Sequence, residues 1–320
     1  MTSAGTSTRT EDVTTGTGTG TGVPPAPGTP PAPGEVPAPS DPPGGRARGG
    51  AGRHLTGWLW ALPVPVVVVA LWYLGATQGW TFPGGIRMGE LPTPGEVLAR
   101  LVDLVGLGSI DDSYSGRLWQ HAWASLVRAL WGFLLAAVLA IPLGVLMGRS
   151  ARLSRMLEPT LNVVRPIPVT AWAPLALIMI GIGDNQAIFL VFLAAFFPVL
   201  VNTVTAVQQV PPRLLEASAM LGAPRWRRLT TVVVPAAVPG IVSGLRVSLG
   251  LAWALLVVGE MTGINLGLGA MITEAKVIAQ TDLIVAGMIV IGLLGFATDR
   301  LLVGLVRLAA RGRPLLRDDR

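Results

Sequence analysis

Six stretches of the chain are apolar enough to cross a lipid bilayer as helices. A spanning helix needs about 20 predominantly apolar residues. The third stretch is shorter than this and contains Pro168 and Pro174, so we expect it to be kinked or tilted. The pattern therefore predicts an all-α integral membrane protein with about six transmembrane helices, at Leu55–Ala76, His121–Met147, Ile167–Ile182, Gln186–Val207, Pro239–Val258 and Leu283–Leu305.

The polar segments between these stretches alternate in charge. Three of them are net basic (149–165, 208–246 and 299–320), and the three that separate them are net acidic (77–123, 183–185 and 259–282). Basic segments stay on the cytoplasmic side of a membrane. Six spans that start from a cytoplasmic N-terminus place every basic segment inside, so we expect both termini in the cytoplasm. In the first outer segment, Leu91-Pro-Thr-Pro94 is expected to open a surface helix over Glu96–Val105.

Composition agrees with a membrane protein and narrows the possible chemistry. Hydrophobic residues make up 51% of the chain and charged residues 13%, against about 25% charged in a soluble domain. The chain has no Cys and two His, so disulfides, thiolate or multi-His metal sites and Cys nucleophiles are excluded, and we predict no metal site. The net charge of +6 is expected to set membrane orientation rather than to bind nucleic acid.

Residues 1–53 differ from the rest of the chain. They contain 10 Thr, 12 Gly and 10 Pro, a composition that cannot bury enough apolar surface to offset the entropy of ordering. We expect a disordered cytoplasmic tail. It is not a secretory signal, because the first apolar run begins near residue 55.

The basic segment between the fourth and fifth spans has a distinctive pattern. An amphipathic helix is expected over Arg213–Leu221, stopped by Gly222 in a left-handed conformation. Pro224 is then expected to start a second short helix, because proline is tolerated in the first turn. An elbow of two helices in the cytoplasm is suited to docking on another protein.

In this segment the chain resembles the permeases of bacterial ATP-binding cassette (ABC) importers. Their cytoplasmic loop carries E-A-A, three residues, G, nine residues and I-x-L-P. The invariant positions are matched here by Glu216, Ala217, Gly222 and Pro235, with Ser218 in place of the second Ala and with Val232 and Val234 in place of Ile and Leu.

The resemblance extends over residues 91–310, where the chain is similar to the nitrate/sulfonate/taurine branch of these permeases. It is carried by Leu91-Pro-Thr-Pro-Gly-Glu-Val97, Leu157-Glu-Pro159, Arg165-Pro-Ile-Pro168, Gly181-Ile-Gly183, Ala195-Phe-Phe-Pro198, Asn202-Thr203, Gly244-Leu-Arg246, Glu260-Met261 and Gly287–Gly295. It implies a type I ABC importer permease fold. The implied organisation is a tail at 1–53, a first transmembrane helix and outer loop at 54–90, the permease domain at 91–310 with a coupling loop at 208–235, and a basic cytoplasmic tail at 311–320.

The resemblance also implies a division of labour between proteins. Two permeases, here expected to be identical copies, form the pathway, two cytoplasmic ATPases drive it, and an extracytoplasmic solute-binding protein delivers the solute. The chain lacks the phosphate-binding motif G-x-x-x-x-G-K-[ST], so it is not expected to be an enzyme or to hold a cofactor, and ATP and Mg belong to the partner ATPase. The residues expected to contact that ATPase are Arg213, Leu214, Leu215, Glu216, Ala217, Ser218, Leu221, Gly222 and Pro235.

Several polar residues within or near the spans are candidates for the solute pathway. They are Arg128, Asn202, Thr203, Ser243, Arg246 and Glu260. Charge inside a membrane is costly and often functional, but the two arginines could instead extend to the membrane surfaces. The hydroxyl and amide groups could equally bond between helices, and Glu260 could be a gate or a helix-packing residue.

The predicted function is therefore a permease subunit, in the plasma membrane of a bacterium, for a small anion. Aliphatic sulfonate or taurine ranks ahead of nitrate, and a thiamine or riboflavin precursor remains an alternative. A stand-alone channel or secondary transporter is the alternative from another class, although neither needs a docking elbow. A membrane-embedded protease would need a second intramembrane carboxylate beside Gly181-Ile-Gly183-Asp184, and the adjacent spans have none.

Overall fold

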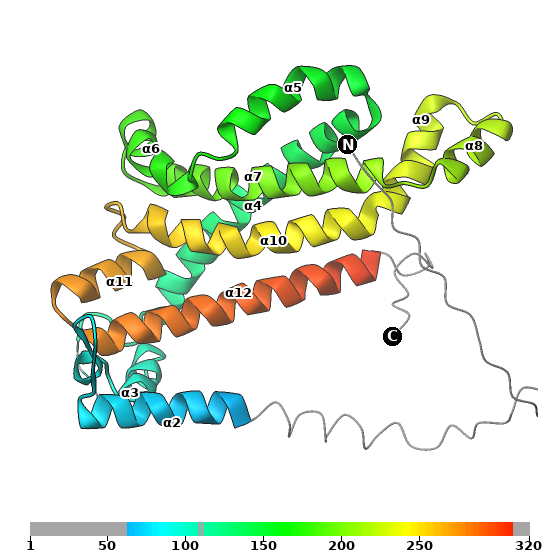
Figure 1. The fold of residues 1–320 in the computed structure, drawn as a ribbon. Helices are drawn as coiled ribbons and strands as arrows, with labels where there is room; N and C mark the ends of the chain where they lie inside the picture. Colours follow the sequence, from blue (N-terminus) through cyan, green and yellow to red (C-terminus); the bar gives the residue numbers. More distant parts are fainter. Residues whose placement is uncertain (1–62, 108–109, 111, 310–320) are drawn as a thin grey trace, which may run out of the picture. The chain divides into compact units, whose positions relative to one another are not determined.

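The computed structural model describes residues 63–107, 110 and 112–309. The predicted tail at 1–53, the beginning of the first predicted span and the C-terminal tail at 311–320 lie outside the described residues. The described part is built from helices, with one short antiparallel strand pair, β1 (Thr81–Phe82) with β2 (Ile86–Arg87). This confirms the prediction of an all-α membrane protein (Figure 1).

Among the described residues, four helices are long and apolar enough to cross a membrane. They are α4 (Leu118–Arg149), α7 (Asp184–Gln208), α12 (Thr281–Ala309) and a continuous helix from Arg225 to Glu260. The last of these combines α9 (Arg225–Arg228), one π-helical turn η3 (Leu229–Val233) and α10 (Val234–Glu260). These four confirm the second, fourth, fifth and sixth predicted spans, and the apolar helix α2 (Pro63–Gln78) forms the described part of the first.

The third predicted span, Ile167–Ile182, is helical as expected, but a further helix precedes it. The structure has α5 (Ala151–Val164) followed by η2 (Val169–Ala171) and α6 (Trp172–Ile180), and the two arms meet at an angle of 73°. Pro166 and Pro168 lie at the bend, where proline lacks an amide hydrogen and its ring clashes with a preceding helical turn. Most of the expected cytoplasmic loop 149–165 is thus a helix, whose Leu153, Leu157 and Leu161 pack against α4 and α7.

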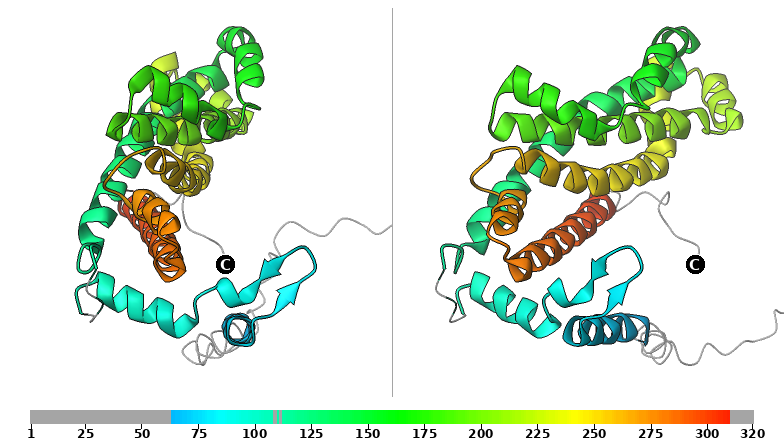
Figure 2. Two further views of the ribbon diagram at one scale, coloured as in Figure 1. Left: turned by 90° about the vertical axis from the view of Figure 1, so that its left-hand side faces the viewer. Right: turned by 60° about the vertical axis from the view of Figure 1, so that its left-hand side comes forward.

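Helix α7 packs along both α4 and α10, and these contacts form the centre of the bundle. Figure 1 shows α7, α10 and α12 following one another side by side, and the views in Figure 2 agree. Glycines allow the close approach: a Cβ on Gly144 of α4 would lie 2.7 Å from Cβ of Thr203, and a Cβ on Gly244 of α10 would lie 2.5 Å from Cβ of Asn202. Small residues permit such packing in membranes.

Segment 77–117, predicted to lie outside the cell, holds the predicted surface helix, α3 (Pro94–Leu104). The Thr93 side chain accepts from the Glu96 amide, and the Glu96 carboxylate accepts from the Thr93 amide, which is a capping box. Val97 and Leu104 are buried against α12 and α11 (Leu268–Val277). The short helix α11 had no counterpart among the predicted elements.

Replacement of Gly244 by Ala tests the close approach of α10 and α7. The added Cβ must push the helices apart, and overpacking of this kind costs about 1–3 kcal/mol. We expect a lower midpoint of thermal unfolding in detergent. Gly250→Ala, in the same helix, is the matched control, because nothing lies within 4 Å of its Cβ position. Equal stability of the two variants would contradict the packing described here.

Candidate functional site

Helix α8 (Pro212–Met220) and α9 form an elbow beyond the end of α7 (Figure 1). Gly222 ends α8 with a φ of +72°, which only glycine adopts without strain. Its amide donates to the Ala219 carbonyl at 2.9 Å, and the Ala223 amide donates to the Ser218 carbonyl at 3.1 Å. This pair of bonds is a Schellman motif, and it confirms the predicted left-handed stop.

The exposed side of the α8 segment carries three large apolar side chains among charged ones. Leu214, Met220 and Leu221 are 46%, 88% and 87% exposed. Glu216 is also exposed, and its carboxylate has no ion pair among the described residues. Apolar side chains gathered on an exposed helix mark a surface for a partner.

The other residues expected at the ATPase contact have different positions. Leu215 packs against the buried cluster of Val207, Val210 and Val233, and Ser218 is buried with its hydroxyl donating to the Leu215 carbonyl. These two residues anchor α8 to the bundle. On the exposed side lie Arg213 and Ala217, while Pro235 is in the first turn of α10.

A buried ion pair lies at the opposite end of the bundle. Arg128 of α4 is 5% exposed and Glu260 at the end of α10 is 1% exposed. Arg128 Nη1 lies 2.7 Å from Glu260 Oε1, and Nη2 lies 2.7 Å from Oδ1 of Asp184 in the first turn of α7. The arginine thus joins three helices.

Further hydrogen bonds complete this cluster. Glu260 accepts from the Ser125 hydroxyl at 2.7 Å and from the Gly269 amide at 2.9 Å. Arg128 Nη1 also donates to the Leu266 carbonyl, and the Ser125 hydroxyl accepts from the Leu268 amide. The carboxylate is therefore satisfied within the protein, and the loop that leads into α11 is held by it.

The structure brings together two of the predicted pathway residues, Arg128 and Glu260, and leaves the others apart. Asn202 and Thr203 of α7 bond back to carbonyls of their own helix, and Ser243 is exposed on α10. Arg246 pairs with Asp299 of α12 through Nε at 2.9 Å and Nη2 at 3.1 Å. Both Arg128 and Arg246 are therefore paired with carboxylates.

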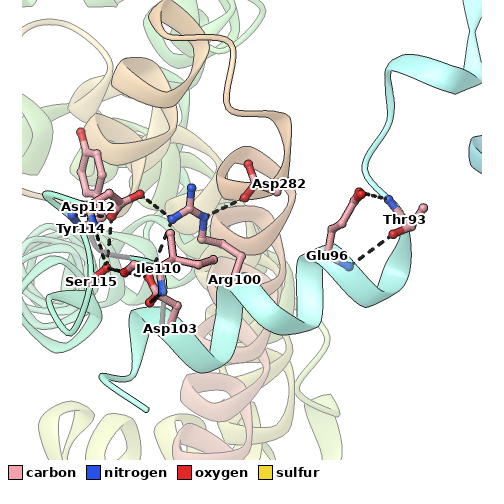
Figure 3. Close-up of polar contacts among 9 residues, drawn as sticks. All are labelled: Thr93, Glu96, Arg100, Asp103, Ile110, Asp112, Tyr114, Ser115 and Asp282. Atoms are coloured by element: carbon pink, nitrogen blue, oxygen red, sulfur yellow. Dashed lines mark hydrogen bonds and ion pairs between the residues drawn. The ribbon is translucent and has the colours of Figure 1, made fainter. Parts of the chain in front are cut away.

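A second buried arginine was not identified from the sequence. Arg100 of α3 is 3% exposed and pairs with Asp112 and with Asp282 of α12, the latter at 2.8 Å from Nε (Figure 3). Asp103 lies 3.8 Å from its Nη1. This cluster attaches the outer segment to α12.

The charges in the Arg100 cluster alter the pKa of Asp112. Burial alone would raise the pKa of this carboxyl, but the Tyr114 amide and the Arg100 guanidinium donate hydrogen bonds to it and outweigh burial, so the pKa is lowered. Burial would lower the pKa of Arg100, and the bonds to Asp112 and Asp282 overcome this and raise it. Both groups are therefore held in their charged forms.

Ser125, Asp184 and Arg100 were thus missed as members of these clusters. Ser125 stands three residues before Arg128, so both occupy one face of an apolar helix. That spacing is the only local feature of the sequence that indicates a buried polar cluster, since the partners Glu260 and Asp282 come from distant helices.

Comparison with known proteins identifies the transport family. The family described as binding-protein-dependent transport system inner membrane component matches residues 140–311. The chain is 35% identical over 248 residues to a putative aliphatic sulfonates transport permease protein of Bacillus subtilis (strain 168), covering 78% of this chain and 85% of that protein.

Two further relatives carry related names. The taurine transport system permease protein of Escherichia coli (strain K12) is 34% identical over 250 residues, which cover 76% of this chain and 88% of that protein. A putative ABC transporter permease protein of Methanocaldococcus jannaschii is 43% identical over 187 residues, which cover 58% of this chain and 70% of that protein.

The Arg100 cluster predicts how stability depends on pH. Because the pKa of Asp112 is lowered in the folded state, its contribution is complete above the usual Asp value of about 4 and is lost as the pH falls through the lower folded value. We expect the thermal midpoint in detergent to fall steeply below about pH 4, and Asp112→Asn to remove part of that fall. Glu90→Gln, in an exposed pair with Arg87, is the control. An unchanged pH profile in Asp112→Asn would contradict the account.

Proposed function

Because the chain belongs to the family of binding-protein-dependent transport system inner membrane components, we propose that two copies of it form the pathway of a bacterial ABC importer. The chain is an ABC importer permease subunit for small solutes, a class of protein that is not itself an enzyme. The family implies ATPase and solute-binding-protein partners. The plasma membrane as its location, cytoplasmic termini and a symmetric pair belong to the proposal.

The exposed elbow is the observation that carries the proposal. Leu214, Met220 and Leu221 present apolar surface on α8, and Glu216 adds a charge without a partner among the described residues. In the predicted topology this surface lies in the cytoplasm, where an ATPase can reach it. We assign most of the contact energy to the apolar side chains, since exposed ion pairs contribute only about 0–1 kcal/mol.

The elbow is joined to both helices at the centre of the bundle. It follows α7 and continues through α9 and η3 into α10 without a break in the helix. In the proposed cycle, ATP and Mg bound by the ATPases close them together, α8 follows, and α7 and α10 are pulled from the inward-facing to the outward-facing arrangement. ATP, bound by the ATPases, favours the outward-facing state because the assembly binds it more tightly in that state than in the inward-facing one. No covalent chemistry occurs on this chain.

The proposed solute is a small anion. Aliphatic sulfonate and taurine are favoured because two relatives carry these substrates in their names, and nitrate follows. The solute-binding protein is expected to make the first selection. A thiamine or riboflavin precursor is the remaining alternative, and it is separated from the anions by competition in an uptake assay.

Substitution of Gly222 by Asp tests the elbow. The position has open space around it but a φ of +72°, so the side chain adds a charge and about 1–2 kcal/mol of backbone strain without a clash. We expect normal abundance in the membrane, weak retention of the ATPase during purification and loss of ATP-dependent uptake. The ATPase retained on the tagged permease and the initial uptake rate are the measurements.

Ala219→Ser is the matched control for this variant. Ala219 is exposed on the same helix, and the change is small, so uptake should stay close to that of the unmodified chain. Wild-type uptake by Gly222→Asp with the ATPase still bound would show that the elbow does not couple the two proteins.

A further inference from the structure

A cavity of about 190 Å³ with a mixed polar and apolar lining lies between α5 and the last turns of α7. Its apolar part includes Met147 of α4 and Leu161 of α5. Its polar part is made by side chains of α5, of the residue that caps it and of α7: Ser154, Glu158, Asn162, Arg165, Thr205 and Gln208. Two larger grooves beside α2 are lined almost entirely by apolar side chains, which suits contact with lipid. The mixed lining of the α5–α7 cavity instead suits a polar solute.

The polar groups of α5 share one face of the helix. Ser154, Glu158 and Asn162 are spaced four residues apart, and Arg165 follows Glu158 by seven, so all four are aligned along the axis. The two charged residues are about 10 Å apart along the helix, at 1.5 Å per residue. On this face, the negative Glu158 and the positive Arg165 line the same cavity.

These two charges do not neutralise each other. Within the described part of the chain, neither Glu158 nor Arg165 takes part in an ion pair. The Glu158 carboxylate accepts one hydrogen bond, from the Ser154 hydroxyl at 3.2 Å. Both side chains are exposed, so water solvates each charge until a solute replaces it.

We propose that this cavity is a solute site for a compact molecule with an anionic and a cationic end, such as an aminoalkyl sulfonate. The proposal rests on the importer function proposed above and narrows its substrate class. Arg165 offers a planar fork of donors that matches a sulfonate or carboxylate, and Glu158 faces the ammonium. Asn162, Thr205 and Gln208 supply the remaining polar contacts.

Charge favours this class of solute over a plain anion. A plain anion such as nitrate would bind Arg165 and leave the exposed Glu158 to water, so the second charge of the cavity would add nothing to its binding. A zwitterion satisfies both groups.

The cavity lies next to the end of α7 from which the elbow begins, so a bound solute could affect the elbow. Gln208, which lines it, is the last residue of α7, and α8 begins four residues later at Pro212. In the predicted topology this is the cytoplasmic end of the pathway, so the site would hold the solute before release into the cell.

Calorimetric titration of the purified full chain tests the site directly. The chain is reconstituted in nanodiscs of phosphatidylglycerol, which has no cationic headgroup, and titrated with 2-aminoethanesulfonate and with ethanesulfonate. We expect 2-aminoethanesulfonate to bind at least about fivefold more tightly, the effect of one partly exposed ion pair. Glu158→Gln should abolish this preference, and Arg165→Gln should weaken the binding of both compounds.

Arg155→Gln is the matched control. Arg155 is also on α5, but its Nε donates to the Ala151 carbonyl and it does not line the cavity, so both affinities should be unchanged. The site is disproved if neither compound binds at millimolar concentration, if the two bind equally, or if Arg165→Gln binds like wild type. It is also disproved if phosphatidylethanolamine in the disc abolishes binding, which would assign the cavity to a lipid headgroup.

The result is independent of the test of the importer function. Gly222 is outside the cavity, so solute binding by Gly222→Asp should be normal even where uptake is lost. Loss of the importer assignment through an active Gly222→Asp variant would leave the titration unaffected, and a failed titration would leave the elbow result unaffected.

Discussion

Arg128 and Glu260 form an ion pair inside the bundle, where either charge alone would be very unfavourable. Removal of one partner of a buried pair costs about 3–5 kcal/mol, because the other charge is left without compensation. Here the pair is reinforced by Asp184, the Ser125 hydroxyl and the Gly269 amide. Its members come from α4, α7, α10 and the start of α11. The arrangement of these four helices therefore depends on one set of charges.

This constraint acts at the end of the bundle that is farthest from the elbow. Helices α7 and α10 have 25 and 27 residues, or about 40 Å of helix at 1.5 Å per residue. Between the two ends, Gly144 and Gly244 let the helix backbones approach closely. The bundle is closely packed at its centre and held at one end by the Arg128–Glu260 ion pair. Such a bundle can transmit a movement of α8 along its length, as the proposed transport cycle requires.

The sequence predicts much of this architecture but little of its internal chemistry. Long apolar runs predicted six spans, four of which are long helices in the described residues, and the spacing of Glu216, Gly222 and Pro235 predicted the elbow, because those signals are local. The third span was placed correctly from Ile167 onward, but helix α5 before it was missed, because its four-arginine segment was assigned to a loop. The pairing of Arg128 with Glu260 joins residues 132 positions apart, and no local pattern records such a contact. From sequence, each charge was as compatible with a solute pathway as with packing.

The most direct test of this account is a double-mutant cycle on the ion pair, with unfolding of the full chain measured in detergent. Arg128→Met and Glu260→Met should each lower the free energy of unfolding by about 3–5 kcal/mol, because each leaves one buried charge unpaired. The double variant, which buries no unpaired charge at these positions, should recover most of that loss. If the double variant instead loses the sum of the two single effects, the pair does not hold the bundle together.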